Sequence, residues 1–151
     1  MKILAENRKA YFHYEILETY LAGIVLQGQE VKSIKSGRIQ LASSYAVFRG
    51  EELFLIGAHI PPYQPANAPA DYNPERHRKL LLHKNELQYL VGKTKERGLT
   101  LVPLRVYIQK GKIKLDLGLA RGKTQRDKRE HIKQREAERE MRSALHGGDL
   151  I

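Results

Sequence analysis

The sequence contains no cysteine and no tryptophan, and no apolar run is long enough to span a membrane. Without cysteine the chain can form neither a disulfide bond nor a thiolate metal site, and catalysis by a cysteine nucleophile is excluded. Charged residues at Glu6, Arg8 and Lys9 precede any apolar stretch of signal-peptide length. We therefore predict a soluble, cytoplasmic protein with no membrane partner.

Patterns typical of metal or acid–base chemistry are also missing. The six histidines form no i, i+4 pair and no zinc-binding helix pattern, so we predict no metal and no cofactor. The carboxylates offer no evident catalytic pair, and we predict that the protein is not an enzyme. One alternative stays open, because His77 or His83, beside Lys79 and Lys84, could act as acid and base in RNA cleavage.

The sequence has abundant positive charge. Its 27 Lys/Arg and 17 Asp/Glu among 151 residues give a net charge of +10, so the expected partner is a polyanion: RNA, DNA or, less often, an anionic membrane. Residues 121–151 hold nine Lys/Arg and six Asp/Glu, and residues 1–120 hold eighteen and eleven. We predict a basic RNA-binding body over 1–120 and a basic C-terminal tail over 121–151.

Apolar alternation and turn residues predict several strands in the body. Residues 14–26 read as a bent strand, and residues 44–57 as a hairpin that turns at Gly50. Residues 99–108 and 112–119 read as two more strands; in the second, every other residue from Ile113 to Leu119 is apolar and should face inward.

Two helices and one long loop complete the predicted body. Residues 28–37 suit a short helix, and residues 82–98 suit an amphipathic helix that ends at a glycine. Five of the six prolines fall within 59–76, which predicts a loop. The predicted fold is mainly β: a small, closed or partly closed antiparallel β-barrel of the oligonucleotide-binding type, with two or three helices.

The stretch GLARGKT (118–124) invites comparison with a phosphate-binding loop. That motif needs four residues between its glycines, whereas Gly118 and Gly122 enclose three, and the antiparallel context is also wrong. We interpret Gly122 as a hinge between body and tail.

Cations and aromatic side chains gather in two stretches of the body. The first, residues 7–14, contains Asn7, Arg8, Lys9, Tyr11, His13 and Tyr14. The stretch RHRKLLLHK (76–84) brackets three leucines with cations and histidines. Such residues supply phosphate contacts and stacking surfaces for RNA, although the leucines could equally be core and the charges a solvated rim. The candidate RNA-binding residues are Asn7, Arg8, Lys9, Tyr14, Arg76, Arg78, Lys79, His83 and Lys84.

The tail begins with cations that could contact phosphates: Arg121, Lys123, Arg126, Lys128 and Arg129. Its later part has a thin apolar stripe and like-charged i, i+4 pairs, which predict a marginal helix that is disordered until a partner binds it. A tail that only improves solubility would show the same pattern.

Several stretches together resemble the SmpB family, the SsrA-binding proteins. They are ENRKA (6–10), YEILETYLAGIVLQGQEVKSIKSG (14–37), HIPPY (59–63), RKLLLHK (78–84), GLTLVPL (98–104) and DKR (127–129). The resemblance implies an oligonucleotide-binding type of barrel that binds the tRNA-like domain of transfer-messenger RNA and delivers it to stalled ribosomes for trans-translation. It also implies a tail that becomes helical in the vacant mRNA channel, against ribosomal RNA near the decoding centre.

The resemblance also assigns roles to particular positions. Asn7 and Leu81 match positions implicated in binding transfer-messenger RNA, and Gly122, Asp127, Lys128 and Arg129 match the tail segment required on the ribosome. The chain departs from the family at three positions: Leu21 replaces a usual Glu, Thr124 replaces a common Lys, and Arg126 replaces an aromatic residue or His.

We therefore expect a monomeric RNA-binding factor of ribosome rescue. The alternative is a structural ribosomal protein, which would share the basic barrel and tail but bind ribosomal RNA permanently.

Overall fold

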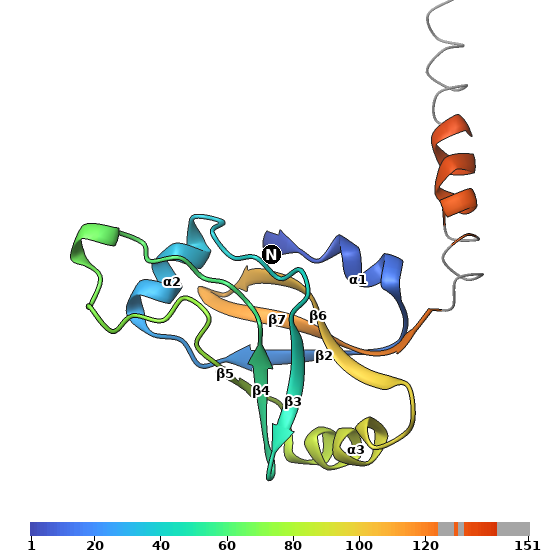
Figure 1. The fold of residues 1–151 in the computed structure, drawn as a ribbon, viewed down its shortest axis with the longest axis horizontal. Coiled ribbons are helices and arrows are strands. Elements are labelled where there is room, and N and C mark those ends of the chain that lie inside the picture. Colours follow the sequence, from blue (N-terminus) through green and yellow to red (C-terminus); the bar gives the residue numbers. More distant parts are fainter. Residues whose placement is uncertain (124–128, 130–131, 142–151) are drawn as a thin grey trace, which may run out of the picture.

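The structure is a computed structural model that describes residues 1–123, 129 and 132–141 (Figure 1). Its elements, in chain order, are β1 (Lys2–Glu6), α1 (Arg8–His13), β2 (Tyr14–Ile24), α2 (Gly28–Lys35), β3 (Tyr45–Arg49), β4 (Glu52–Ile56), a 3₁₀ helix (Pro65–Asn67), β5 (Arg78–Leu81), α3 (Lys84–Thr94), β6 (Leu99–Gln109) and β7 (Lys112–Gly122). In the tail, residues 129 and 132–141 are helical.

The seven strands form one antiparallel sheet in the order β1-β6-β3-β4-β5-β2-β7, and a further pairing of β6 with β7 curls the sheet into a ring. The ring is only partly closed, because β3 meets β6 through the single pair Ala46 and Leu101. The predicted mainly β fold, a partly closed antiparallel barrel with helices, is confirmed. Sequence patterns missed β1, α1 and β5, which are all short.

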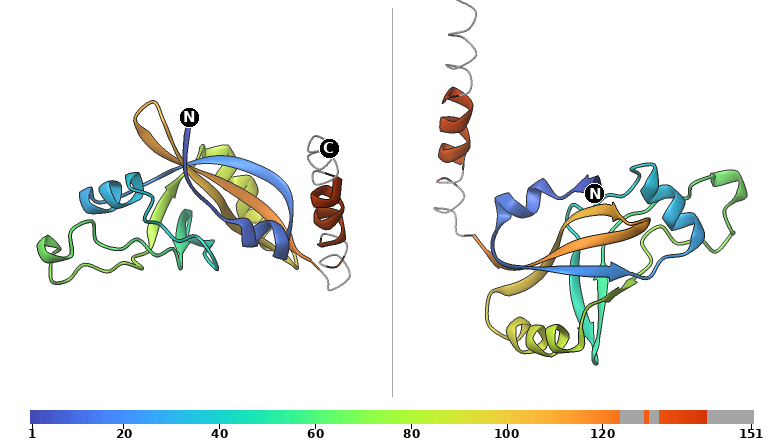
Figure 2. Two further views of the ribbon diagram at one scale, coloured as in Figure 1. Left: turned by 90° about the horizontal axis from the view of Figure 1, so that it is seen from above. Right: turned by 180° about the vertical axis from the view of Figure 1, so that it is seen from behind.

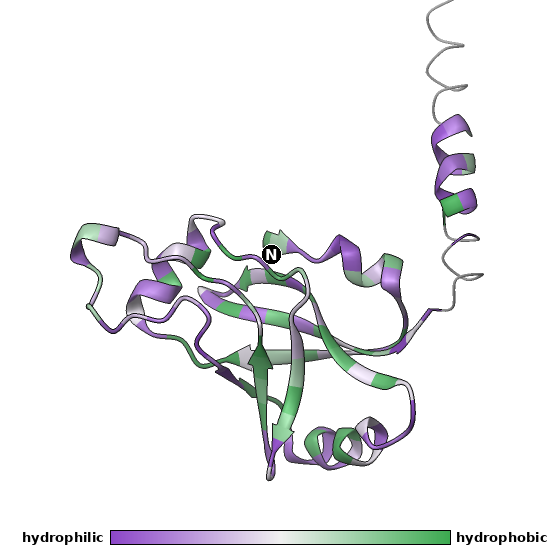
Figure 3. Ribbon diagram, in the orientation of Figure 1, coloured by the Kyte–Doolittle hydropathy of each residue, from purple (hydrophilic) through white to green (hydrophobic). Residues whose placement is uncertain are grey.

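The interior of the barrel is built from alternate residues of the long strands. On β7, Leu115, Leu117 and Leu119 are at most 1% exposed, as their alternation with polar residues predicts, while Ile113 near the strand's start is half-buried. Figure 3 shows the resulting apolar colouring of the strands. The helices differ in position: α3 and α2 lie toward opposite ends of the barrel, and α1 lies outside its wall (Figures 1 and 2).

A second, smaller apolar cluster lies outside the barrel wall and holds α1. Ala10 of α1 packs there with Val102, Leu104 and Ala120. The glycine at position 118 makes this close packing possible, because a Cβ added there would come within 3.1 Å of Leu104 and 3.3 Å of Ile16. Gly118 is therefore a packing residue within β7.

Within the described part of the chain, none of the helices combines the length and the apolar character needed to cross a membrane.

Candidate RNA-binding surface

The strand β2 presents one continuous outer face from α1 to β5. It pairs with β7, Ile16 opposite Ala120 and Thr19 opposite Gly118, with a bulge between Ile16 and Glu18. Directly paired residues point to the same side of a sheet, so the bulge brings even-numbered residues before it and odd-numbered residues after it to the same side. We call this side the β2 face; along it lie Tyr14, Ile16, Thr19, Leu21 and, on the neighbouring strand, Leu81.

At one end of the β2 face lies the basic helix α1. Arg8, Lys9 and His13 are exposed or partly exposed on it, and Tyr14 follows as the first residue of β2. Arg8 contacts Glu6 at 3.8 Å, and 87% of its side chain is exposed, so its charge is available to a partner. These residues are the part of the predicted site where phosphates could be bound.

Asn7 lies buried beneath this end of the site and holds α1 in place. Its side chain is 5% exposed, its Oδ1 accepts a hydrogen bond from the backbone N–H of Ala10, and its Nδ2 donates to the backbone oxygen of Pro103 at 2.8 Å. It therefore caps α1 and ties the helix to β6. In this geometry Asn7 holds α1 in place, and its side chain is not presented to solvent.

At the other end of the β2 face lies an apolar patch with a cationic border. Leu81 pairs with Gly23, and Leu81 and Leu21 are each 49% exposed. Both leucines line a shallow hollow together with His83 and Lys114. Lys84, the first residue of α3, is exposed beside His83.

Six of the predicted residues form two groups on one face: Arg8, Lys9 and Tyr14 at one end, and Leu81, His83 and Lys84 at the other. Tyr14 and Gly23 are nine residues apart on β2, which corresponds to about 30 Å at roughly 3.3 Å per residue. Figure 2 shows β2 running as one ribbon between the two ends. A partner that contacts both groups has to extend over that length, as a folded RNA does.

The acidic residue Asp116 on the same face is paired with neighbouring hydrogen-bond donors. Asp116, opposite Leu21, accepts hydrogen bonds from Arg105 Nε at 2.5 Å and from the hydroxyl of Tyr107 at 3.1 Å. Burial, and then the hydrogen bond to Asp116, raises the pKa of Tyr107. The charge of Asp116 is thereby balanced locally, which leaves the cations at the two ends to set the sign of the face.

The opposite side of β2 holds α3 in position. Glu18 accepts hydrogen bonds from the hydroxyls of Tyr20 and Tyr89, the latter at 3.0 Å. The pKa of Glu18 is lowered, chiefly by the hydrogen bond from Tyr20 and then by that from Tyr89. This contact links the strand to α3, so His83 and Lys84 at the start of that helix are fixed relative to Leu81.

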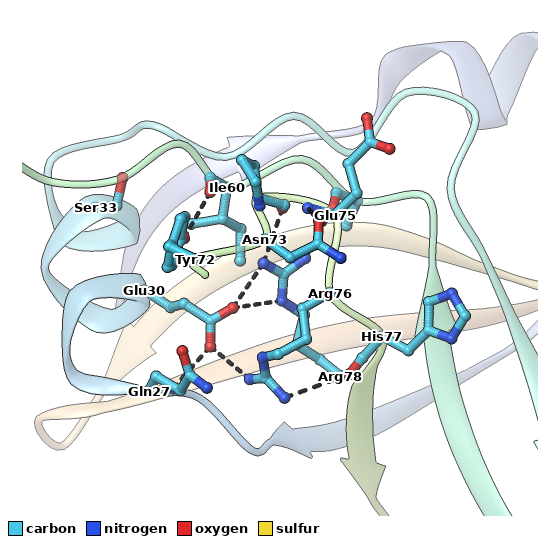
Figure 4. A network of polar contacts seen from close by, with 12 residues as sticks. Gln27, Glu30, Ser33, Ile60, Tyr72, Asn73, Glu75, Arg76, His77 and Arg78 are labelled. Carbon is cyan, nitrogen blue, oxygen red and sulfur yellow. Dashed lines mark hydrogen bonds and ion pairs between the residues drawn. The ribbon is translucent and has the colours of Figure 1, made fainter. Parts of the chain in front are cut away.

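Arg78 is not part of the surface, which corrects its predicted role as an RNA contact. It is 0% exposed, and its Nε donates to Glu30 at 2.6 Å while its other nitrogens donate to the backbone oxygens of Ala58 and Pro74. Arg76 donates to the other oxygen of Glu30 at 2.5 Å and remains about one third exposed (Figure 4). The two arginines fasten the proline-rich loop to α2.

Lys79, between these arginines and Leu81, faces solvent. Its side chain is 42% exposed and its Nζ lies 3.4 Å from Glu52 on β4. The three residues Arg78, Lys79 and Leu80 therefore alternate as a strand requires: the first and third point into the barrel, and the second points out.

The geometry gives no support to two alternatives: RNA cleavage that uses His77 or His83, and a phosphate-binding loop over residues 118–124. His77 precedes β5 and contacts Arg49, whereas His83 follows β5 and precedes α3, so the two histidines lie at opposite ends of the strand. The RNA-cleavage alternative, in which either histidine acts with Lys79 or Lys84, therefore stays a prediction. Gly122 is the last residue of β7, so the GLARGKT stretch begins inside a strand and does not form a phosphate-binding loop.

The junction between body and tail is fixed by hydrogen bonds to α1. The backbone N–H of Lys123 donates to the oxygen of His13, and its Nζ donates to the oxygen of Tyr11, both at 2.9 Å. Gly122 is exposed at the end of β7, so this strand and these hydrogen bonds include residues 121–123 at the start of the predicted tail. Arg129 is helical and exposed, whereas Arg126, Asp127 and Lys128 lie outside the described residues.

Three residues of this surface were not identified as candidates from the sequence: Tyr45, Arg105 and Lys114. They lie on different elements, and only the pairing of the strands brings them to the two ends of the β2 face. The cation–aromatic pairing of Arg105 with Tyr107 at i, i+2 was a visible but unspecific signal.

Comparison with known proteins gives one consistent family. The family described as SmpB protein matches residues 4–147. An SsrA-binding protein of Thermosynechococcus vestitus is 51% identical over 96% of this chain and 95% of its own, and one of Carboxydothermus hydrogenoformans is 53% identical over 95% and 96%. A solved structure described as "tmRNA-SmpB: a journey to the center of the bacterial ribosome" matches with a TM-score of 0.67 and 51% identity, over 80% of this chain and 85% of that chain. With a family match over nearly its whole length and relatives at half identity, the chain belongs to the SmpB family.

Proposed function

We propose that this chain is an RNA-binding factor, and not an enzyme, that binds the tRNA-like domain of transfer-messenger RNA and delivers it to stalled ribosomes in the cytoplasm for trans-translation. The relatives named SsrA-binding protein and the structural match to a tmRNA-SmpB complex support this assignment. The supporting observation from this structure is the β2 face, about 30 Å long, with exposed cations at both ends and exposed leucines at one of them.

In this proposal the body binds the RNA. The residues that contact it are Arg8, Lys9, Tyr14, Lys79, Leu81, His83 and Lys84. Asn7 and the buried Arg78 hold these contacts in position, and Arg76 does so while part of it is exposed at the edge. Cations on phosphates supply most of the affinity, and the aromatic and leucine side chains pack on bases and riboses.

The tail acts at a later step. We propose that residues 124–151 form a helix in the vacant mRNA channel, where Asp127, Lys128 and Arg129 meet ribosomal RNA near the decoding centre. The described tail residues 132–141 are helical and exposed on every side, with Ile132 42% and Met141 68% exposed. Because this helix has so little apolar surface to bury on its own body, a charged partner is the natural source of its stability.

The proposal is tested by equilibrium binding of the purified chain to the tRNA-like domain and to an elongator tRNA over a range of salt concentrations. We expect tighter binding of the tRNA-like domain at every salt concentration, and a linear fall of log affinity with log salt as counterions are released. Equal affinity for the two RNAs would contradict the assigned partner.

The same preparation separates the proposal from the ribosomal-protein alternative. A delivery factor should leave ribosomes in a high-salt wash and need transfer-messenger RNA to associate with them. A structural ribosomal protein would stay on the ribosome under both conditions.

A further inference from the structure

A polar recess opens at the α1 end of the β2 face, on the side toward β3. It has a volume of about 410 Å³ and lies between α1, the turn before β3, and β6. Binding sites for small ligands have volumes of about 300–1,000 Å³, and one nucleotide fits near the lower end of that range. The recess is therefore large enough for a single nucleotide and too small for a paired helix.

The side chains that line the recess suit a nucleotide. Lys9 and His13 come from α1, Tyr14 from β2, and Tyr45 from β3. None of the described residues that line it is acidic, so nothing there repels a phosphate. Two tyrosines provide ring faces, and base–aromatic stacking is the common way in which proteins hold an unpaired base.

The turn that carries Tyr45 has an unusual backbone. Ser43, which also lines the recess, has a φ of 67°, a left-handed conformation that non-glycine residues rarely adopt. Ser44 holds the turn, because its backbone N–H and its hydroxyl both donate to the oxygen of Leu41. A residue with a strained backbone conformation, held in place by its neighbours at the rim of a recess, is typical of binding sites.

The side chain of Tyr45 contributes little to the core. It is 42% exposed, although it is a large aromatic residue at the start of a barrel strand. The seam beside it is weak, since β3 joins β6 only at Ala46. An exposed ring at an open seam is available to stack on a base that enters from solvent.

We propose that the recess holds one unstacked nucleotide of the bound RNA, with its base on the ring of Tyr45 and its phosphate beside Lys9. This inference rests on the proposed function for the identity of the RNA, but the recess can be tested without it. It extends the RNA-binding surface around α1 to residues that none of the sequence motifs contains. It also makes recognition depend on an unpaired position in the RNA.

The absence of tryptophan provides a direct reporter. Tyr45→Trp introduces a single tryptophan into the chain, and a base stacked on its ring will change its fluorescence. Tyr63→Trp is the matched control, because Tyr63 is 37% exposed but lies on the proline-rich loop, away from the recess. We expect the indole emission of the Tyr45→Trp chain to change on titration with a short single-stranded RNA and with the tRNA-like domain. The emission of the Tyr63→Trp chain should stay constant with both.

Affinity gives the second readout. Tyr45→Ala should weaken binding of the tRNA-like domain roughly 5- to 150-fold, the range found for removing one stacked base, while Tyr45→Phe keeps the ring and the affinity. Thermal unfolding of Tyr45→Ala should show a much smaller loss of stability than truncation of a core residue such as Leu80, because Tyr45 is 42% exposed. Two results would overturn the recess assignment: an unchanged affinity of Tyr45→Ala, or an unchanged emission of Tyr45→Trp in a complex that a gel shift shows to be formed.

The single-stranded RNA separates this inference from the proposed function. A response of the Tyr45→Trp chain to single-stranded RNA without any binding of the tRNA-like domain would support the recess and contradict the proposed partner. A response to fully paired RNA as strong as that to single-stranded RNA would contradict the recess, which has no room for a helix.

Discussion

At the scale of single residues, the most consequential contact is the buried carboxylate of Glu30. It is 0% exposed and accepts hydrogen bonds from Arg76, Arg78 and the backbone N–H of Gln27. Burial alone would raise the pKa of Glu30, but the three hydrogen bonds outweigh it and lower the pKa. The ionised form of Glu30 is therefore the form that holds the proline-rich loop to α2.

Replacing Glu30 should destabilise the fold strongly. Glu30→Gln leaves two guanidinium groups without their counter-charge, one of them fully buried, and we expect a loss of about 3–5 kcal/mol in the free energy of unfolding. Urea denaturation at neutral pH measures this loss. Glu75→Gln is the control, since Glu75 is exposed and lies 3.7 Å from His59, and it should change the free energy by less than about 1 kcal/mol.

The same contact predicts a pH dependence. Because the pKa of Glu30 is lower in the folded chain than its ordinary value of 4.5, its contribution is fully present above that value and is lost as the pH falls through the folded pKa. We expect the stability of the parent chain to fall more steeply than that of Glu30→Gln over this acid range. Parallel stability curves for the two chains would show that Glu30 is not the responsible group.

At the scale of elements, two adjacent leucines of β5 have different roles: Leu80 belongs to the core and Leu81 to the surface. Leu80 is 1% exposed and belongs to the main core, whereas Leu81 is 49% exposed at the end of the β2 face. Leu80→Ala should cost about 2–5 kcal/mol of stability. Leu81→Ala should cost much less stability and instead weaken binding of the tRNA-like domain.

Both quantities can be measured on both variants, by thermal unfolding and by gel shift. A Leu81→Ala chain that loses stability but, while folded, binds RNA like the parent would remove Leu81 from the RNA-binding surface.

Sequence reasoning succeeded for elements whose pattern is long and failed where contacts are distant. The strand over 112–119 was predictable because four apolar residues alternate with polar ones along it, and the helix from 84 onward because its leucines share one side. The short helix α1 has no such period; it depends on Asn7 and on the packing site that Leu104 and Gly118 form much later in the chain.

The same limit explains the error over Arg78. In RHRKLLLHK all four cations appear equivalent, and only the position of Glu30, 48 residues earlier, selects Arg78 for the interior. The resemblance to a family identified the functional class, but it could not tell a side chain that contacts RNA from one that holds the contact in place, as Asn7 does.

At the scale of the whole molecule, we propose a division of labour between body and tail. The body, residues 1–123, contains the whole barrel and both ends of the β2 face. All the aromatic residues also belong to it. Lys123 is hydrogen-bonded to α1, so a truncation that respects the fold has to keep it. The tail beyond carries the segment that we assign to the ribosome.

The central claim is that the body alone is the binding site for the tRNA-like domain, and the most direct test is the affinity of the chain that ends at Lys123. We expect this truncated chain to bind the tRNA-like domain nearly as tightly as the full chain, because the cations and rings that contact the RNA are retained, while tagging of stalled nascent chains in the same buffer is lost. If truncation lowers the RNA affinity as steeply as it lowers tagging, the tail is part of the primary RNA-binding site, and the assignment of that site to the β2 face is wrong.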